Sequence, residues 1–332
     1  MKKIISNSIK IIVSLLIAAV ILYFTYRDYD FSLFWSDLAG MHLGWLIAAV
    51  TFSALGPVFR GLRWNLILEP IGYRIPARDS ILTVFTGYAA NILIPRFGEI
   101  SRCAILDTYN KVPFSKSFGT LVAERFVDMI LLVLITGTTV LTQFDKFTAL
   151  FRGDAALQTT GPIPAEAATP LLQTPGFWIW TAVALIAVIT VSILWIKFDL
   201  WEKTRQFVRN FWSGFTALKS VSNLPLFIIW SIGIWICYYL EMYLAFFCMD
   251  STAAIGPTAG LVCFVAGSIA VLIPTPNGAG PWHWSVASML VLYGVSHTDA
   301  HTFALVLHTA QTFAYLLFGA IAWIALHLIR RK

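Results

Sequence analysis

The sequence predicts an all-α integral membrane protein, and three observations support this fold class. Of the 332 residues, 58% are hydrophobic and 12% are charged, whereas soluble domains carry roughly 25% charged residues. Apolar stretches near the length of about 20 residues that a membrane-crossing helix needs recur along the chain. The net charge of +6 comes from basic residues between these stretches, which favours a role in membrane orientation over nucleic-acid binding.

Six segments are long and apolar enough to be full spans. They are residues 9–26, 44–64, 122–141, 177–196, 226–249 and 303–329. The first follows a basic start, but no small-residue cleavage site precedes TYRDYD. We therefore expect an uncleaved first span rather than a removable signal peptide.

Two further apolar segments, 80–110 and 257–294, are interrupted by PRFGE and PTPNGAGPWHW. Each half is short for a full crossing, so we expect two re-entrant helical hairpins. This topology puts most Lys and Arg residues and both termini on the cytoplasmic side and leaves Arg27, Lys146 and Arg152 outside. A single crossing by either segment would break that separation, whereas two hairpins that each cross twice would preserve it.

The connecting segments fit this topology. Residues 142–176 are rich in Pro, Thr, Ala and Gly with little charge, which is typical of an outer loop. Residues 197–222 mix basic and aromatic residues at roughly helical spacing. They are either an amphipathic helix on the cytoplasmic membrane surface or a plain solvated connector.

The chain contains signs of an internal repeat. The tripeptide LIP occurs at 93–95 and 272–274, and a glycine follows each copy, at Gly98 and Gly278. The expected spans around the second copy follow those around the first by about the same number of residues that separates the two copies. We therefore predict two units, 1–141 and 177–332, joined by the outer loop 142–176. Because each unit crosses the membrane three times, the second is inverted relative to the first, an arrangement typical of transporters.

The two interruptions combine helix breakers with polar residues. Pro95, Pro274 and Pro276 are the breakers, because proline lacks a backbone N–H and disfavours helix at the preceding residue. Gly98 would then begin a half-helix whose free N–H groups attract an anion such as a lipid phosphate. In the second interruption Asn277 could cap the following half-helix.

Ionisable residues inside apolar segments are functional candidates, because their burial in a membrane is costly. The candidate substrate-binding residues are Asn91, Arg96, Gly98, Glu99, Arg102, Glu124, Arg125, Asp128, Glu241, Asn277, Gly278, Gly280, Trp282 and His283. These charges could instead form an internal salt-bridge network that joins Arg125 to Glu99 or Glu241. Glu241 has no local partner, so it either pairs across the repeat interface or stays protonated.

Other polar residues carry weaker signals. His297, His301 and His308 have helical spacing but no further ligand to complete a zinc site, so polar capping of the last helix explains them better. The four cysteines lie in apolar segments and are expected to act as small hydrophobic residues. We expect no metal and no cofactor, and we assign no catalytic residue.

Four sequence blocks resemble the lysylphosphatidylglycerol synthase transmembrane-region family, which includes the membrane module of the bacterial multiple peptide resistance factor. The blocks are FRGLRWNLIL, NILIPRFGEISRCAIL, VAERFVDMILL and LIPTPNGAG. The resemblance implies a multi-pass protein of the bacterial cytoplasmic (inner) membrane that moves a phospholipid, with Arg60 and Arg63 as basic residues facing lipid on the cytoplasmic side. Where the family often has a charged pair, this chain has PWHW at 281–284. No synthase domain follows Lys332, so a separate synthase of the lipid cargo is an expected partner.

Three functions remain open at this stage. The leading one is a lipid flippase that binds a phospholipid, aminoacylated or zwitterionic, between the two hairpins, as a monomer or a homodimer. The second is a membrane transferase with a lipid-linked donor, using Asp28 and Asp30 or His283. The third is a secondary transporter for small solutes. No nucleotide-binding motif is present, so a flippase would use a gradient or work passively.

Overall fold

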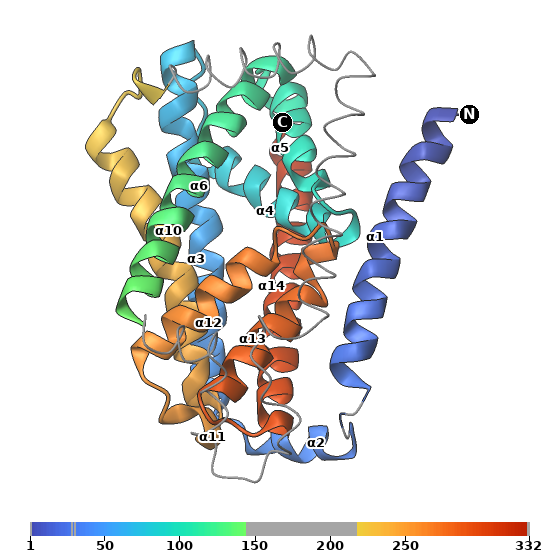
Figure 1. The fold of residues 1–332 in the computed structure, drawn as a ribbon. Helices are drawn as coiled ribbons and strands as arrows, with labels where there is room; N and C mark the ends of the chain where they lie inside the picture. The colour runs from blue at the N-terminus through green and yellow to red at the C-terminus, as the bar shows by residue number, and fades with distance from the viewer. Residues whose placement is uncertain (1, 28, 30, 144–217, 331–332) are drawn as a thin grey trace, which may run out of the picture.

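The fold is a bundle of helices. The computed structural model describes residues 2–27, 29, 31–143 and 218–330, which form helices and short connections with no β-strand among them (Figure 1). The all-α prediction is therefore confirmed. Three described helical segments are long and apolar enough to cross a membrane, namely Leu43–Ile71, Leu224–Cys248 and His297–Ile329. They overlap the predicted spans 44–64, 226–249 and 303–329.

The helices fall into two sets on either side of the undescribed stretch. The first set is α1 (Lys2–Tyr26), α2 (Phe31–Gly40), α3 (Leu43–Leu68), α4 (Ala77–Leu93), α5 (Phe97–Asn110) and α6 (Phe114–Thr142). The second is α10 (Leu224–Ala245), α11 (Asp250–Ala253), α12 (Pro257–Ala270), α13 (Pro281–Leu292) and α14 (His297–Arg330). The predicted span 177–196, nearly all of the loop 142–176, most of 197–222, and Asp28 and Asp30 lie outside the described residues.

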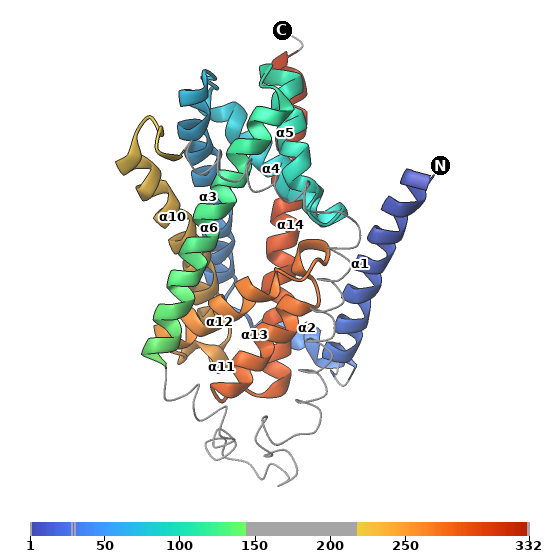
Figure 2. The same cartoon turned by 45° about the horizontal axis from the view of Figure 1, so that its top comes forward.

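Long helices and half-length helices have different places in the bundle. Figures 1 and 2 show α3, α10 and α14 running along most of its height, while α4 and α5 occupy one end and α12 and α13 the other. The two helix pairs turn toward each other near the middle. There the Arg96 guanidinium donates a hydrogen bond of 3.1 Å to the Leu272 carbonyl. The predicted helix interruptions thus contact each other across the bundle.

The turn between α4 and α5 follows from its sequence. Ile94 is extended, as the residue before a proline prefers, and Arg96 takes a left-handed conformation with φ of 61°. The N–H of Gly98 donates to Asn91 Oδ1 at 2.7 Å. Gly98 lies so close to the carbonyl of Gly87 that a Cβ would overlap it. Asn91 and Gly98 therefore hold the two half-helices together.

The turn between α12 and α13 uses glycine differently. Gly278 and Gly280 have positive φ, of 75° and 92°, which glycine adopts without strain. Asn277 also has a positive φ, and its side chain donates to Thr312 Oγ1 at 2.8 Å. The prediction that Asn277 caps α13 is wrong, because Gly280 occupies the cap position and its N–H donates to His283 Nδ1 at 3.3 Å.

Replacing Gly98 with alanine should destabilise the protein, because the new methyl group meets the Gly87 backbone and the Asn91 side chain. Overpacking of this kind costs about 1–3 kcal/mol, which should appear as a lower Tm of the detergent-solubilised protein. Gly119→Ala in α6 is the matched control, since no atom of the described residues lies within 4 Å of its added Cβ. Equal Tm values for the two variants would contradict this account of the turn.

Candidate functional site

A cluster of buried ion pairs joins α3 to α6. Arg60 Nη1 lies 2.7 Å from Glu124 Oε1 and 2.6 Å from Asp128 Oδ2. Arg63 contributes two more pairs, 3.1 Å to Glu124 and 2.7 Å to Asp128. Residues three and four apart share a helix face, so the two arginines of α3 meet the two acids of α6 as sets. The side chains of Arg63 and Glu124 have no exposed surface.

Helix α5 adds a third arginine to this cluster. Arg102 Nη2 lies 3.1 Å from Glu124 Oε2, and its guanidinium carbon lies 4.1 Å from the centre of the Trp64 ring. Trp64 in turn donates from Nε1 to Thr120 Oγ1 at 2.9 Å. Stacking on an aromatic ring suits the planar guanidinium. Arg102 is therefore fixed from two sides, by an acid of α6 and a ring of α3.

Arg125 and Glu99 form the more open edge of the cluster. Arg125 Nε lies 3.2 Å from Glu99 Oε1, and the two side chains are 40% and 35% exposed. Arg125 also lies 3.6 Å from Glu124 and from Asp128. The predicted alternative of a network joining Arg125 to Glu99 is thus present in the structure, and no described ion pair joins Arg125 to Glu241.

The positions of Arg60 and Arg63 correct a prediction. They were expected to face lipid, but they are buried, at 4% and 0% exposure. The physical reason is that Glu124 and Asp128 are also buried, and buried acids need opposite charges nearby. Four arginines therefore meet three acids in the described cluster.

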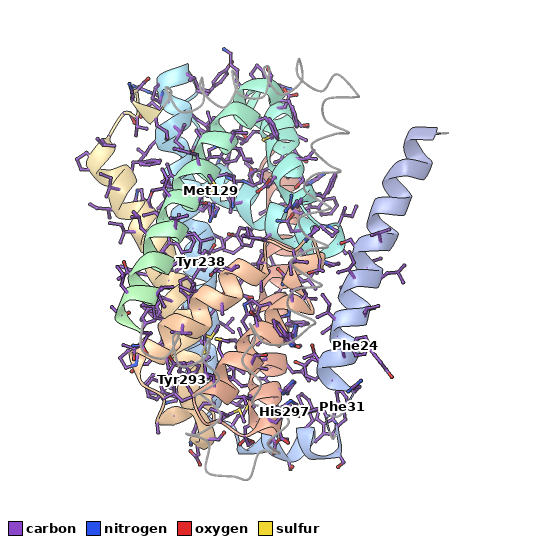
Figure 3. All side chains as sticks on the ribbon, viewed as in Figure 1. Phe24, Phe31, Met129, Tyr238, Tyr293 and His297 are labelled. Atoms are coloured by element: carbon purple, nitrogen blue, oxygen red, sulfur yellow. The ribbon has the colours of Figure 1, made fainter. Side chains whose placement is uncertain are left out.

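A cavity of about 520 Å³ lies beside the cluster, between the two sets of helices. Its wall includes Arg60, Arg125 and Asp128 from the cluster, together with apolar side chains of α6, α10 and α12. Met129 of α6 and Tyr238 of α10, labelled in Figure 3, belong to this wall. The volume lies within the range of about 300–1,000 Å³ that is usual for small-molecule sites.

Three tyrosines and Gln311 complete the wall, and Ser53 bonds to two of these side chains. The hydroxyls of Tyr88 and Tyr238 lie 2.5 Å apart. Ser53 donates to the Tyr315 hydroxyl at 2.8 Å and accepts from Gln311 Nε2 at 3.2 Å. Sequence reasoning did not select these residues, although tyrosine and glutamine within apolar helices were a usable signal.

The structure brings some predicted residues to the cavity and keeps others away. Asn277, Trp282 and Glu241 line the cavity, as do the cluster residues Arg60, Arg125 and Asp128. His283 is buried at 3% exposure but does not line the cavity, and Trp284 of the PWHW block is 59% exposed. Arg96 is exposed at the contact between the two turns. Asn91, Gly98, Gly278 and Gly280 shape the backbone rather than the wall.

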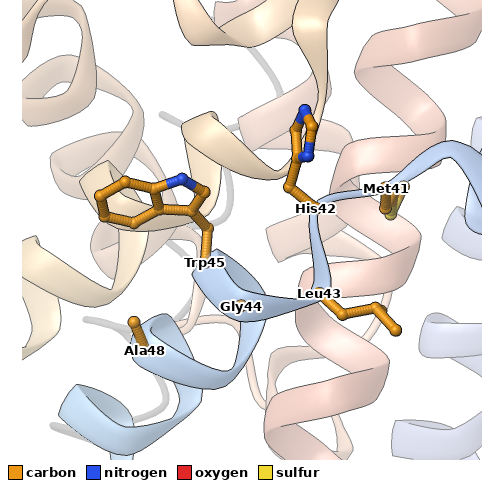
Figure 4. Close-up of a pocket in the computed structure, with 6 residues that line it drawn as sticks. All are labelled: Met41, His42, Leu43, Gly44, Trp45 and Ala48. Carbon is orange, nitrogen blue, oxygen red and sulfur yellow. The ribbon is translucent and has the colours of Figure 1, made fainter.

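A second recess lies at the other end of α3. It is an open hollow around His42, Leu43 and Trp45, shown in Figure 4. His42 Nε2 lies 3.3 Å from Asp250 Oδ1, with both side chains largely exposed. Across the described ranges, no three His, Cys, Asp or Glu side chains gather as a metal site. The ion pair at this recess is exposed, whereas ion pairs beside the cavity of about 520 Å³ are buried. We therefore take that charged cavity as the candidate functional site.

Comparison with known proteins agrees with the membrane architecture. The family described as "Lysylphosphatidylglycerol synthase TM region" matches residues 11–319. Glycosyltransferase AglD of Haloferax volcanii is 29% identical over 91 residues, which are 27% of this chain. The chain covers only 14% of that relative's length.

Replacing Glu124 with glutamine should strongly destabilise the protein, because it removes the acid shared by Arg60, Arg63 and Arg102. Breaking a buried pair on one side costs about 3–5 kcal/mol, measured as a lower Tm or loss of monodisperse protein in detergent. Glu69→Gln is the control, since Glu69 pairs at 3.0 Å with an Arg74 side chain that is 87% exposed. That variant should change stability by about 1 kcal/mol or less. A Glu124→Gln protein as stable as the control would refute the structural role of the cluster.

Proposed function

The chain belongs to the lysylphosphatidylglycerol synthase TM-region family, and from this premise we propose that it translocates a phospholipid across the bacterial cytoplasmic membrane. The head group enters the cavity between the two helix sets while the acyl chains stay in the bilayer. The observation that carries the proposal is the charged cavity, whose wall contains residues from both sets of helices. A volume of about 520 Å³ suits a polar head group.

The proposed architecture has six spans and two re-entrant hairpins, α4–α5 and α12–α13, in two inverted units, 1–141 and 177–332. The starts of α10, α12, α13 and α14 each follow those of α3, α4, α5 and α6 by about 180 residues. The hairpins lie at opposite ends of the bundle, and both chain ends lie toward the end that holds α4 and α5 (Figure 1). We place that end in the cytoplasm, following the distribution of basic residues.

The arginine edge of the cavity is the proposed phosphate site. Arg60 and Arg125 line the cavity, and Arg60 Nε has no hydrogen-bond partner within the described structure. Guanidinium groups bind phosphate by paired hydrogen bonds. Asp128 on the same wall supplies a negative charge for the amine of a zwitterionic or aminoacylated head group.

A membrane transferase is the second candidate, because the relative from Haloferax volcanii is named a glycosyltransferase. In that case the cavity would hold a lipid-linked donor. His283, which the sequence offered as a catalytic group, lies outside the cavity wall, while Asp28 and Asp30 lie outside the described residues. The flippase is therefore the better-supported function.

Replacing Arg125 with glutamine should slow lipid movement in reconstituted vesicles by about tenfold or more, because a charge-assisted hydrogen bond is worth about 1.5–3 kcal/mol. Movement is followed with a fluorescent phosphatidylglycerol analogue whose outer-leaflet fraction is quenched by dithionite. Arg74→Gln, at a side chain that is 87% exposed, should retain the wild-type rate.

The outcomes separate the candidate functions. Equal rates for the Arg125→Gln and Arg74→Gln proteins, with both folded, would remove Arg125 from the lipid site. A wild-type protein that moves no lipid but transfers a sugar from a lipid-linked donor would favour the transferase. Uptake of a small solute without lipid movement would favour the secondary transporter.

A further inference from the structure

Glu241 of α10 differs from every other acid in the described interior. Its side chain lines the cavity, the residue is 5% exposed, and its Oε1 has no hydrogen-bond partner among the described residues. No ion pair of Glu241 is found in the described ranges, although Glu124 and Asp128 each pair with several arginines. An acid that no described cation pairs with therefore faces the space in which the proposed head group binds.

The groups nearest to Glu241 are neutral hydrogen-bonding side chains. Ser53 and Gln311 are hydrogen-bonding neighbours of its carboxyl, and the Ser53 hydroxyl also donates to the Tyr315 hydroxyl. The titratable and charged side chains that share its surroundings are Arg60 on α3, Tyr88 on α4, Arg125 and Asp128 on α6, Cys237 and Tyr238 on α10, and His308 and Tyr315 on α14. The two arginines among them already contact Asp128.

This arrangement favours a neutral carboxyl. Burying an ionised carboxylate without a paired cation costs several kcal/mol, and such a group takes up a proton instead. Glu124 can stay ionised in the interior because the arginines around it compensate its charge. A protonated Glu241 can also use its O–H as a hydrogen-bond donor, which an ionised one cannot.

We propose that Glu241 is a proton-binding site coupled to the lipid site, so that a proton and an anionic phospholipid cross the membrane together. The proposal rests on the flippase function above. An anionic phosphate at Arg60 and Arg125 would add negative charge to the cavity that Glu241 lines, and it would repel an ionised carboxylate. Protonation removes this repulsion.

The coupling is reciprocal. If the lipid raises the affinity of Glu241 for a proton, the proton raises the affinity of the cavity for the lipid by the same factor. The proton comes from water on the side to which the cavity is open, and it returns to water on the other side when the lipid leaves. A proton gradient would then drive lipid movement in a chain that carries no nucleotide-binding motif.

The first test measures binding of the fluorescent phosphatidylglycerol analogue to the full-length, detergent-solubilised protein at acidic and alkaline pH. We expect the wild type to bind about five- to 150-fold tighter at acidic pH, the usual range of coupling between sites. The Glu241→Gln protein, which mimics the protonated acid, should bind equally at both pH values and close to the acidic wild-type affinity.

A control variant assigns the pH effect to its source. Asp107→Asn, at an exposed position of α5, should keep the wild-type pH dependence. Pronounced pH dependence in the Glu241→Gln protein, or its absence in the wild type, would overturn the proposal. So would a Glu241→Gln protein that loses binding of phosphatidylethanolamine alone, because Glu241 would then be a ligand for the head-group amine.

The second test imposes a pH gradient on vesicles that contain the protein. Wild-type lipid movement should speed up when the gradient runs in the direction of movement, and Glu241→Gln should move lipid without responding to it. A wild type that moves lipid but ignores the gradient would refute the coupling. A wild type that moves no lipid would refute the proposed flippase, and the pH dependence of binding would still decide whether Glu241 is the proton site.

Discussion

The cost of burying charge inside an apolar bundle organises this protein. Glu124 has no exposed side-chain surface, and it lies within 3.1 Å of arginines from α3 and α5. Separated from its partners, each of these charges would cost several kcal/mol. The arrangement therefore fixes the relative positions of three helices. It also fixes the turn between α4 and α5, because Arg102 follows that turn by only a few residues.

The cluster is also one wall of the cavity, which links stability to function. Arg60 and Asp128 contribute both to the buried network and to the cavity surface. Arg125, at the edge, is 40% exposed and has longer contacts of 3.6 Å to Glu124 and Asp128. A ligand phosphate could compete for Arg125 without dismantling the inner pairs. The inner charges keep the site in place, and the outer arginine is the one free to respond to a ligand.

Local rules explain why the sequence predicted the helix interruptions, whereas the partners of the buried charges depended on packing. Proline and glycine act on their own backbone, so Pro95 and Gly98 marked the break between α4 and α5. Arg63 and Asp128 lie on different helices, and their 2.7 Å contact depends on how α3 packs against α6. Arg63 could not be assigned to the interior from its neighbours in sequence. Asn277 was misread for the same reason, because its partner is Thr312 on α14.

The acids of the interior thus occupy two environments, and the difference indicates their roles. Glu124 and Asp128 are compensated by fixed arginines, so their charge is part of the folded state and changing it would disturb the bundle. Within the described part of the chain, Glu241 has the neutral side chains of Ser53 and Gln311 as hydrogen-bonding neighbours and no ion-pair partner, so it can gain or lose a proton without breaking a described ion pair. A transporter that couples substrate movement to a proton needs an acid that can gain and lose that proton. The acid must also lie where the bound substrate changes its electrostatic surroundings. Among the described acids that line the cavity, Glu241 meets both conditions.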